Sequence, residues 1–180
     1  MKLNFNFNEL ATKIHENAKA KGFYDNIDEN HFGKFLNHQI YEVVKEIAEF
    51  HEAYKKGIST PSTAYTDIVL LKDPTMFRMI VKDTYQDELA DAIIRILDIA
   101  KYMDYDLLEE FDVYEEPELS NYDISGICLD ITMALSEQLL NDALDNIFYL
   151  AHNMNIDILW HIEAKMDYNT TREKLHGKKF

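Results

Sequence analysis

Residues 42–49 read Glu-Val-Val-Lys-Glu-Ile-Ala-Glu, and this stretch combines an acidic row with an apolar one. Glu42, Glu46 and Glu49 recur at i, i+4 and i+7, so they share one face of a helix. The apolar surface beside that row comes from Val43, Val44, Ile47 and Ala48. Apolar residues keep a helical spacing from about His31 to Lys56, which predicts one long helix with carboxylates next to its packing face.

A second pair of acidic residues has the same geometry on the next helical stretch. Glu88 and Asp91 are spaced i, i+3. Thr84 and Asp87, at the spacing of a capping box, predict that this helix begins there and runs to about Tyr102. Its apolar flank is dense: Leu89, Ala90, Ile93, Ile94, Ile96 and Leu97. If the two helices turn their acidic faces to each other, both pairs of carboxylates meet in one place.

Such a meeting would bring together Glu46, Glu49, Glu88 and Asp91. Two unit charges about 4 Å apart cost roughly 4 kcal/mol at an effective dielectric constant near 20, so the group needs protons or a bound cation. Ligands that are all oxygen favour Mg²⁺, or Mn²⁺, over Zn²⁺. Glu42 is a spare carboxylate that could orient a metal-bound water for attack on phosphorus. The competing interpretation is a solvated acidic helix face.

The composition bounds the class of protein. The chain has 180 residues, of which 47% are hydrophobic, and this suits one well-packed domain over residues 1–180. Few glycines and prolines, with helical spacing nearly throughout, predict an all-α bundle of about five main helices. The formal net charge of −15 disfavours binding to a nucleic acid polymer or an anionic membrane surface.

Cysteine usage and hydropathy indicate the compartment. The lone Cys128 excludes an internal disulfide framework and suits a reducing environment. We expect it to be a core residue, because nothing near it in the sequence would activate its thiol. There is no apolar run of membrane-spanning length and no charged-then-apolar leader. We therefore expect a cytoplasmic protein without a membrane partner.

Three more helices are expected from the same spacing. The first covers Phe7 to Lys19 and ends at Gly22. Another runs from about Ile124 to Asn153, and the last begins near Asp157. The length of the helix over residues 124–153 suits a bundle or a subunit interface.

Two segments interrupt this helical pattern. Residues 58–82 contain Pro61, Pro74 and a Ser/Thr cluster. We interpret them as an insertion that is a functional flap, a short helix around Met76 to Val81, or a partly disordered loop. Residues 104–123 hold nine acidic residues and no basic one, which predicts a solvated acidic linker.

Two other parts of the chain offer groups for a ligand. Phe23 and Tyr24 form an aromatic turn that plugs the end of a bundle or, alternatively, stacks one ring on a planar ligand.

From residue 165 onward, the chain contains two acidic residues and five basic ones: Lys165, Arg172, Lys174, Lys178 and Lys179. A metal-binding face with a basic tail suggests a triphosphate ligand, because Mg²⁺ commonly binds through carboxylates and substrate phosphates together. Arginine suits bidentate contact with phosphate.

The order of these motifs carries a family resemblance. Glu46-x-x-Glu49 is followed on the next helix by Glu88-x-x-Asp91. Further similarity lies in residues 14–18 (Ile-His-Glu-Asn-Ala), 21–25 (Lys-Gly-Phe-Tyr-Asp), 88–100 and the ending from residue 165, Lys-x-x-x-Asn-x-x-Arg and His-Gly-Lys-Lys-Phe. Together they resemble the all-α nucleoside triphosphate pyrophosphohydrolases of the MazG-like group, which includes the dimeric dUTPases and dCTPases.

The resemblance implies a hydrolase that converts a nucleoside triphosphate, or deoxynucleoside triphosphate, to the monophosphate and pyrophosphate. It implies that Mg²⁺ is held by Glu46, Glu49, Glu88 and Asp91. We expect Glu46 and Glu49 to act in catalysis through this ion, together with the water-orienting Glu42. It implies that substrate is contacted by Asn17, Phe23, Tyr24, Lys165, Asn169, Arg172 and Lys178. It also implies a homodimer or homotetramer.

A hypothesis of another class is a non-catalytic acidic helical protein that serves oligomerisation or partner binding. In that case the carboxylates are a solvated face, and divalent ions should not affect melting. The enzyme hypothesis instead predicts stabilisation by Mg²⁺, because a ligand that binds only the folded chain raises its stability.

Overall fold

The structure, a computed structural model, is an all-helical bundle, as the helical spacing of apolar residues in the sequence predicts. The structure describes residues 2–4, 6–25, 27, 32–61, 73–108, 110–112 and 119–177. These ranges contain α1 (Phe7–Ala20), α2 (Phe32–Lys56), α3 (Pro74–Ile80), α4 (Tyr85–Tyr102), α5 (Asn121–Ser136), α6 (Leu140–Asn153), α7 (Ile158–Thr171) and a 3-10 turn, Lys174–Gly177. Two short strands, β1 (Lys2–Asn4) and β2 (Glu110–Asp112), pair antiparallel. The predicted all-α class is confirmed.

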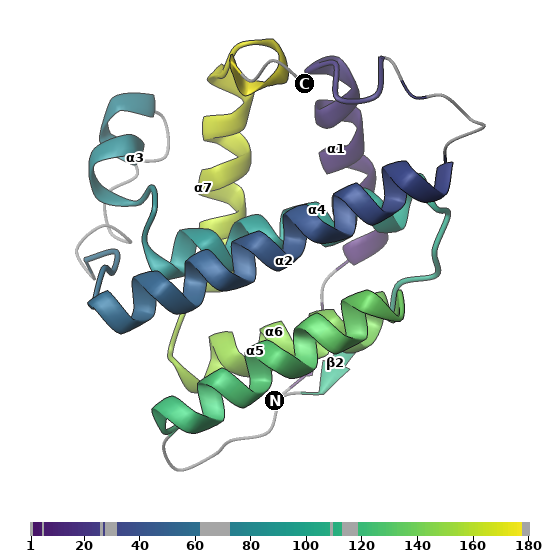
Figure 1. Cartoon of the computed structure of the whole chain (residues 1–180). Helices are drawn as coiled ribbons and strands as arrows, with labels where there is room; N and C mark the ends of the chain where they lie inside the picture. The colour runs from purple at the N-terminus through teal and green to yellow at the C-terminus, as the bar shows by residue number, and fades with distance from the viewer. Residues whose placement is uncertain are drawn as a thin grey trace.

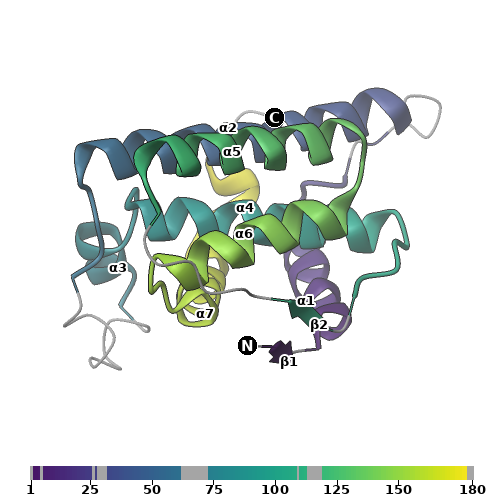
Figure 2. The same cartoon turned by 90° about the horizontal axis from the view of Figure 1, so that it is seen from below.

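Helix α4 lies at the centre of the arrangement. It runs alongside α2, and α1 and α7 stand on one side of this pair while α5 and α6 cover the other (Figure 1). The view from below shows α5 against α2 and α6 against α4 (Figure 2). Helix α4 therefore packs mainly against α1, α2, α6 and α7.

The composition of α4 explains its central place. Of its 18 residues, 12 are buried, and they lie on every side of the helix. A helix that is apolar nearly all round is stable only when other elements cover it. Thr84 caps its first turn by accepting a hydrogen bond from the backbone N–H of Asp87 at 3.3 Å. Even so, no helix in the described part of the chain is long and apolar enough to cross a membrane.

The single helix predicted over residues 124–153 is wrong, because the chain reverses between α5 and α6. Gln138 adopts a left-handed conformation with φ 61°, which a continuing helix cannot contain. Helix α5 also begins earlier than expected, at a capping box between Ser120 and Asp123. Neither glycine nor proline marks the reversal in the sequence. The two helices pack against each other as a hairpin.

The two interrupting segments are partly described. In the insertion over residues 58–82, α3 begins at Pro74, and the Asp73 side chain accepts from the backbone N–H of Thr75 at 2.8 Å. The short-helix interpretation is thus confirmed for that part, and residues 62–72 lie outside the described residues.

In the acidic linker, Leu107 is buried and β2 pairs with β1, so this part is not simply solvated. Residues 109 and 113–118 lie outside the described residues.

A leucine-to-alanine pair tests the central place of α4. Leu97→Ala should lower the free energy of unfolding by about 2–5 kcal/mol, because the side chain is fully buried and truncation leaves a cavity. Leu108→Ala, between α4 and β2, where the residue is 51% exposed, should change it by less than about 0.5 kcal/mol. Urea denaturation followed by circular dichroism measures both. Equal losses for the two variants would contradict the architecture.

Candidate functional site

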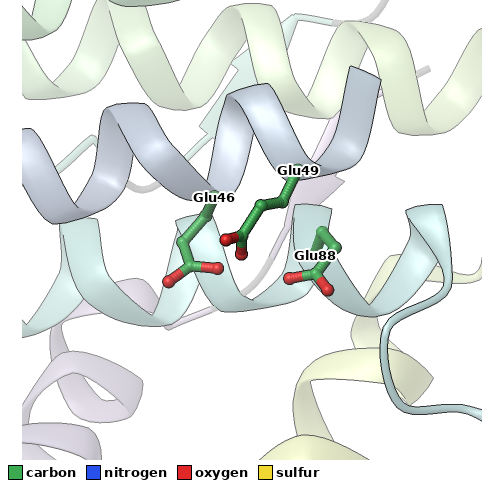
Figure 3. A group of neighbouring side chains, drawn as sticks. All are labelled: Glu46, Glu49 and Glu88. Carbon is green, nitrogen blue, oxygen red and sulfur yellow. The ribbon is translucent and has the colours of Figure 1, made fainter. Parts of the chain in front are cut away.

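Three glutamates from two helices converge on one point. Glu46 and Glu49 project from α2 toward Glu88 on α4 (Figure 3). One carboxylate oxygen from each lies within 4.8 Å of the others. Glu46 and Glu88 are buried, whereas Glu49 is exposed. Glu88 also lies in the first turn of α4, where the helix dipole favours negative charge.

The structure places the fourth predicted ligand, Asp91, differently. Its Oδ2 lies 2.9 Å from Nζ of Lys165 on α7. The same ammonium group lies 2.8 Å from Oδ2 of Asp87, and Lys165 is only 4% exposed. The predicted metal ligand Asp91 and the predicted substrate contact Lys165 are therefore partners of each other. Within the described residues, Asp91 is not part of the three-glutamate group.

A second cation, Arg95, lies on the other side of the glutamates. Its Nε lies 2.8 Å from Oε1 of Glu46, an ion pair in which the N–H direction is not aligned for a hydrogen bond. Its Nη2 lies 4.0 Å from Glu42, which also pairs with Lys45 at 3.2 Å. Sequence reasoning missed Arg95. Its spacing of i+7 from Glu88 places it on the acidic face of α4 and could have identified it.

Burial and crowding make two glutamates weak acids. Burial and the charge of Asp87 raise the pKa of Glu88 to about 9. Burial and the charge of Asp91 raise the pKa of Glu46 to about 7, although Arg95 opposes this. Burial alone would also raise the pKa of Asp91, but the charges of Lys165 and Arg95 hold it below its ordinary value. Without a bound cation, Glu88 therefore keeps its proton at neutral pH.

A pocket adjoins this charged face between α1, α4 and α7, with an empty volume of about 800 Å³ that includes space open to solvent. Five of the predicted substrate-binding residues line it: Asn17, Phe23, Tyr24, Asn169 and Arg172. Asp91 and Arg95 line it too, so the pocket reaches the carboxylate network. The structure thus brings together residues separated by about the whole length of the chain.

The aromatic turn forms one wall of this pocket, and both rings are packed. Tyr24 contacts His15, Phe35 and Tyr102 with ring centroids 4.6–5.7 Å apart. Phe23 lies edge-on to His176 at 5.0 Å. The bundle-plugging and ligand-stacking interpretations are therefore compatible, because rings that pack on protein also face the pocket.

Sequence reasoning missed a polar pair beside this wall. Nδ1 of His15 lies 2.7 Å from Oδ1 of Asp98, which is one of the pocket residues. Asp98 is three residues after Arg95 on α4, so the helix spacing places both on neighbouring parts of the pocket.

The basic tail folds back on the end of α1. Nζ of Lys21 donates to the backbone oxygens of Thr170 and Arg172 at 2.7 Å and 2.5 Å, and Lys174 pairs with Asp25 at 2.5 Å. Gly22 permits this approach, because it has φ 83° and a Cβ there would collide with Lys174. Lys178 lies outside the described residues.

Asn169 stands out among the pocket residues. Its side chain is 6% exposed, and its Oδ1 has no hydrogen-bond partner within the described part of the chain. A buried acceptor without a partner costs free energy, so it is expected to accept a hydrogen bond from a bound group or water. Its place in the pocket wall makes it a contact for a polar ligand.

Cys128 shows the behaviour expected of a packing residue. It packs against the hydrophobic core, and burial raises the pKa of its thiol to about 11. The thiolate needed for nucleophilic attack is therefore scarce at neutral pH.

Comparison with known proteins gives no match to a protein-family model, to a curated protein or to a solved structure. The functional assignment therefore rests on the chemistry of the site. Its donors fit a hard divalent cation, because three carboxylates supply only oxygen and their mutual repulsion would be relieved by the ion.

The raised pKa values predict how Mg²⁺ affects melting at different pH values. The pKa of Glu88 is raised from 4.5 to about 9, so without a cation the folded state loses stability as pH rises through that range. Mg²⁺ must displace the proton, so its affinity should rise by about tenfold per pH unit for each proton displaced. A fixed excess of Mg²⁺ should therefore raise Tm more at about pH 8.5 than at about pH 6. Equal shifts in differential scanning fluorimetry at both pH values would contradict this assignment.

Proposed function

We propose that the protein is a Mg²⁺-dependent nucleoside triphosphate pyrophosphohydrolase that releases pyrophosphate and the nucleoside monophosphate. The observation that carries the proposal is the adjoining position of two sites on α4. The group Glu46, Glu49 and Glu88 lies on its α2 side, and the pocket lined by the predicted substrate residues lies on its α1 and α7 side. The resemblance of the motifs to the MazG-like group supports the same reaction.

Mg²⁺, or Mn²⁺ in its place, would be held by the carboxylates of Glu46, Glu49 and Glu88. When bound, it would polarise a phosphoryl oxygen and acidify a water. Glu42, one turn before Glu46 and paired with Lys45, would orient a water rather than bind the ion. We assign it that role because its side chain is 15% exposed and so can reach solvent.

The pocket residues would hold the nucleotide. Arg172 would bind phosphate oxygens through its guanidinium group, which already donates to the backbone oxygen of His176 at 3.2 Å. The unsatisfied Oδ1 of Asn169 would accept a hydrogen bond from a sugar hydroxyl or base amine. Phe23 and Tyr24 would contact the base, and Asn17 adds an amide to the same wall.

The direct test is release of pyrophosphate and monophosphate from a panel of canonical and modified nucleoside triphosphates, with Mg²⁺ and with chelator. We expect Mg²⁺-dependent release from one or a few of them. Release that chelator does not affect would refute the metal's role. No release from any of them, with no effect of Mg²⁺ on Tm, would refute the proposed function.

A matched pair of glutamate variants tests the metal site. Glu49→Gln should lower kcat/KM by at least about 100-fold. Loss of a direct metal ligand should cost at least as much activity as loss of a residue that orients a ligand. Its stability without metal should be unchanged or higher, because one repelling charge disappears. Glu52→Gln is the control, since that glutamate lies three residues further along α2 and pairs with Lys56 in solvent. Steady-state kinetics and thermal melting compare the two, and full activity of Glu49→Gln would refute its assignment.

Self-association is a second candidate function, favoured by an apolar stripe on α5. Its exposed members are Tyr122, Leu129 and Met133, with Gly126 between the first two. They lie at i, i+7 and i+11 and so share one helix face. Such a stripe would suit a second copy of this chain, as a homodimer or within a homotetramer.

The stripe makes a prediction about oligomeric state. Met133→Glu should lower the mass measured by light scattering, because a charge introduced into an apolar interface would be desolvated. Met79→Glu on α3, where the methionine is 75% exposed, should leave the mass unchanged. A wild-type chain that is monomeric at high concentration would rule out the stripe as an interface between copies.

A further inference from the structure

Asp98 places a carboxylate on the wall of the pocket, well away from the three glutamates along α4. At a rise of 1.5 Å per residue, Asp98 lies about 15 Å beyond Glu88 along the helix axis. Asp91, Arg95 and Asp98 recur at i, i+4 and i+7, so they follow one face of α4 along the pocket. Of these three residues, Asp98 is the farthest from Glu88.

Two side chains from α1 and the turn after it hold the Asp98 carboxylate. Nδ1 of His15 lies 2.7 Å from Oδ1 of Asp98, and the two side chains are only 13% and 16% exposed. Tyr24 is a second hydrogen-bond partner of Asp98, and burial together with the charge of Asp98 raises the pKa of the Tyr24 hydroxyl group. Tyr24 therefore keeps its proton and donates it. A carboxylate can accept about four hydrogen bonds, so capacity remains for a ligand in the pocket.

The charged residues distinguish two ends of the pocket. Arg95 and Arg172 line it together with Asp98. Phosphate groups would be attracted by the arginines and repelled by Asp98, so they belong toward Arg95, on the side of the glutamates. The part of a ligand that meets Asp98 must instead offer N–H or O–H groups, because an ionised carboxylate only accepts hydrogen bonds.

Apolar side chains from three helices line the same pocket. Ile14 and Ala18 come from α1, Ile94 from α4 and Met166 from α7. With the rings of the aromatic turn they suit the flat apolar faces of a nucleobase. A base held between such walls would present its polar edge to the side chains that can hydrogen-bond.

We propose that Asp98, oriented by His15 and Tyr24, determines specificity in this pocket and selects nucleotides whose base carries an exocyclic amino group. This inference rests on the proposed function, because it takes the ligand to be a nucleotide. Cytosine, adenine and guanine carry such a group, whereas uracil, thymine and hypoxanthine do not. A carbonyl oxygen in place of the amine would be repelled by Asp98 and would leave a partly buried acceptor unpaired. His15 acts through Asp98 and is a positioning residue.

Matched deoxynucleoside triphosphates test the inference in the wild-type chain: dCTP with dUTP, dATP with dITP, and dGTP with dITP. The best amino-bearing substrate should exceed its partner without the amine in kcat/KM by at least about tenfold, because a hydrogen bond to a charged group is lost. Pyrophosphate release in the presence of Mg²⁺ measures this ratio.

An aspartate variant separates recognition from a structural role. Asp98→Asn should abolish the ratio, because an amide can donate to a carbonyl oxygen as well as accept from an amine. Asp106→Asn is the matched control and should keep the ratio, since that aspartate is exposed and does not line the pocket. A purely structural pairing of His15 with Asp98 would lower Tm in Asp98→Asn and leave the ratio unchanged, which would overturn the inference.

Variants of His15 keep the test decisive if Asp98→Asn does not fold. His15→Asn keeps an N–H donor near the position of Nδ1, whereas His15→Leu removes it. The ratio should therefore be retained in the first variant and fall in the second. A folded His15→Leu with the wild-type ratio would overturn the inference.

Binding of the corresponding monophosphates, measured by isothermal titration calorimetry, separates this inference from the proposed function. Amine-dependent binding without hydrolysis of any triphosphate would support the inference and overturn the proposed function. Hydrolysis without a preference for the amine would overturn the inference and leave the proposed function standing. Neither hydrolysis nor binding of any of these nucleotides would overturn both.

Discussion

The contact between α2 and α4 is the constraint on which the rest of the structure depends. It buries apolar residues of both helices and, along one edge, places the carboxylates of Glu46 and Glu88 out of water. Burying like charges is unfavourable unless cations or protons compensate them. The fold supplies Lys165 from α7 and Arg95 from α4 itself, and the raised pKa of Glu88 supplies a proton. The acidic edge thus retains negative charge that a divalent ion would neutralise.

Much of this arrangement could be read from local sequence patterns. The bounds of α1, α2 and α4 and the start of α7 agree with the predicted ones within about two residues, because strong apolar spacing and caps such as Thr84 and Asp157 are local signals. The meeting of Glu46, Glu49 and Glu88 followed from helix geometry together with one assumption, that the two acidic faces turn toward each other. The packing of α2 on α4 satisfies that assumption.

Other features depended on contacts that no local pattern contains. The pairing of Lys165 with Asp87 spans 78 residues, so neither the burial of that lysine nor the second role of Asp87 could be read from a capping motif. The chain reversal at Gln138 has no glycine or proline to mark it. Arg95 could be placed on the acidic face by its spacing, but only the three-dimensional structure shows that it pairs with Glu46. The helices could be predicted from the sequence, but the pairing of charged residues that are far apart in the chain could not.

Helix α7 links the two halves of the site through its own spacing. Lys165, Asn169 and Arg172 lie at i, i+4 and i+7, so one side of the helix end faces α4. Lys165 neutralises the inner acids, whereas Asn169 and Arg172 line the pocket that also contains Asp91. Helix α7 would therefore bind substrate and, through Lys165, also reduce the negative charge on this face of the pocket. A ligand with negative charge would meet Arg172 and Arg95 there, while the carboxylates behind them are paired with cationic side chains or would hold the proposed metal ion. In a chain with a formal net charge of −15, this local balance is what would let a polyanionic substrate approach the proposed metal site.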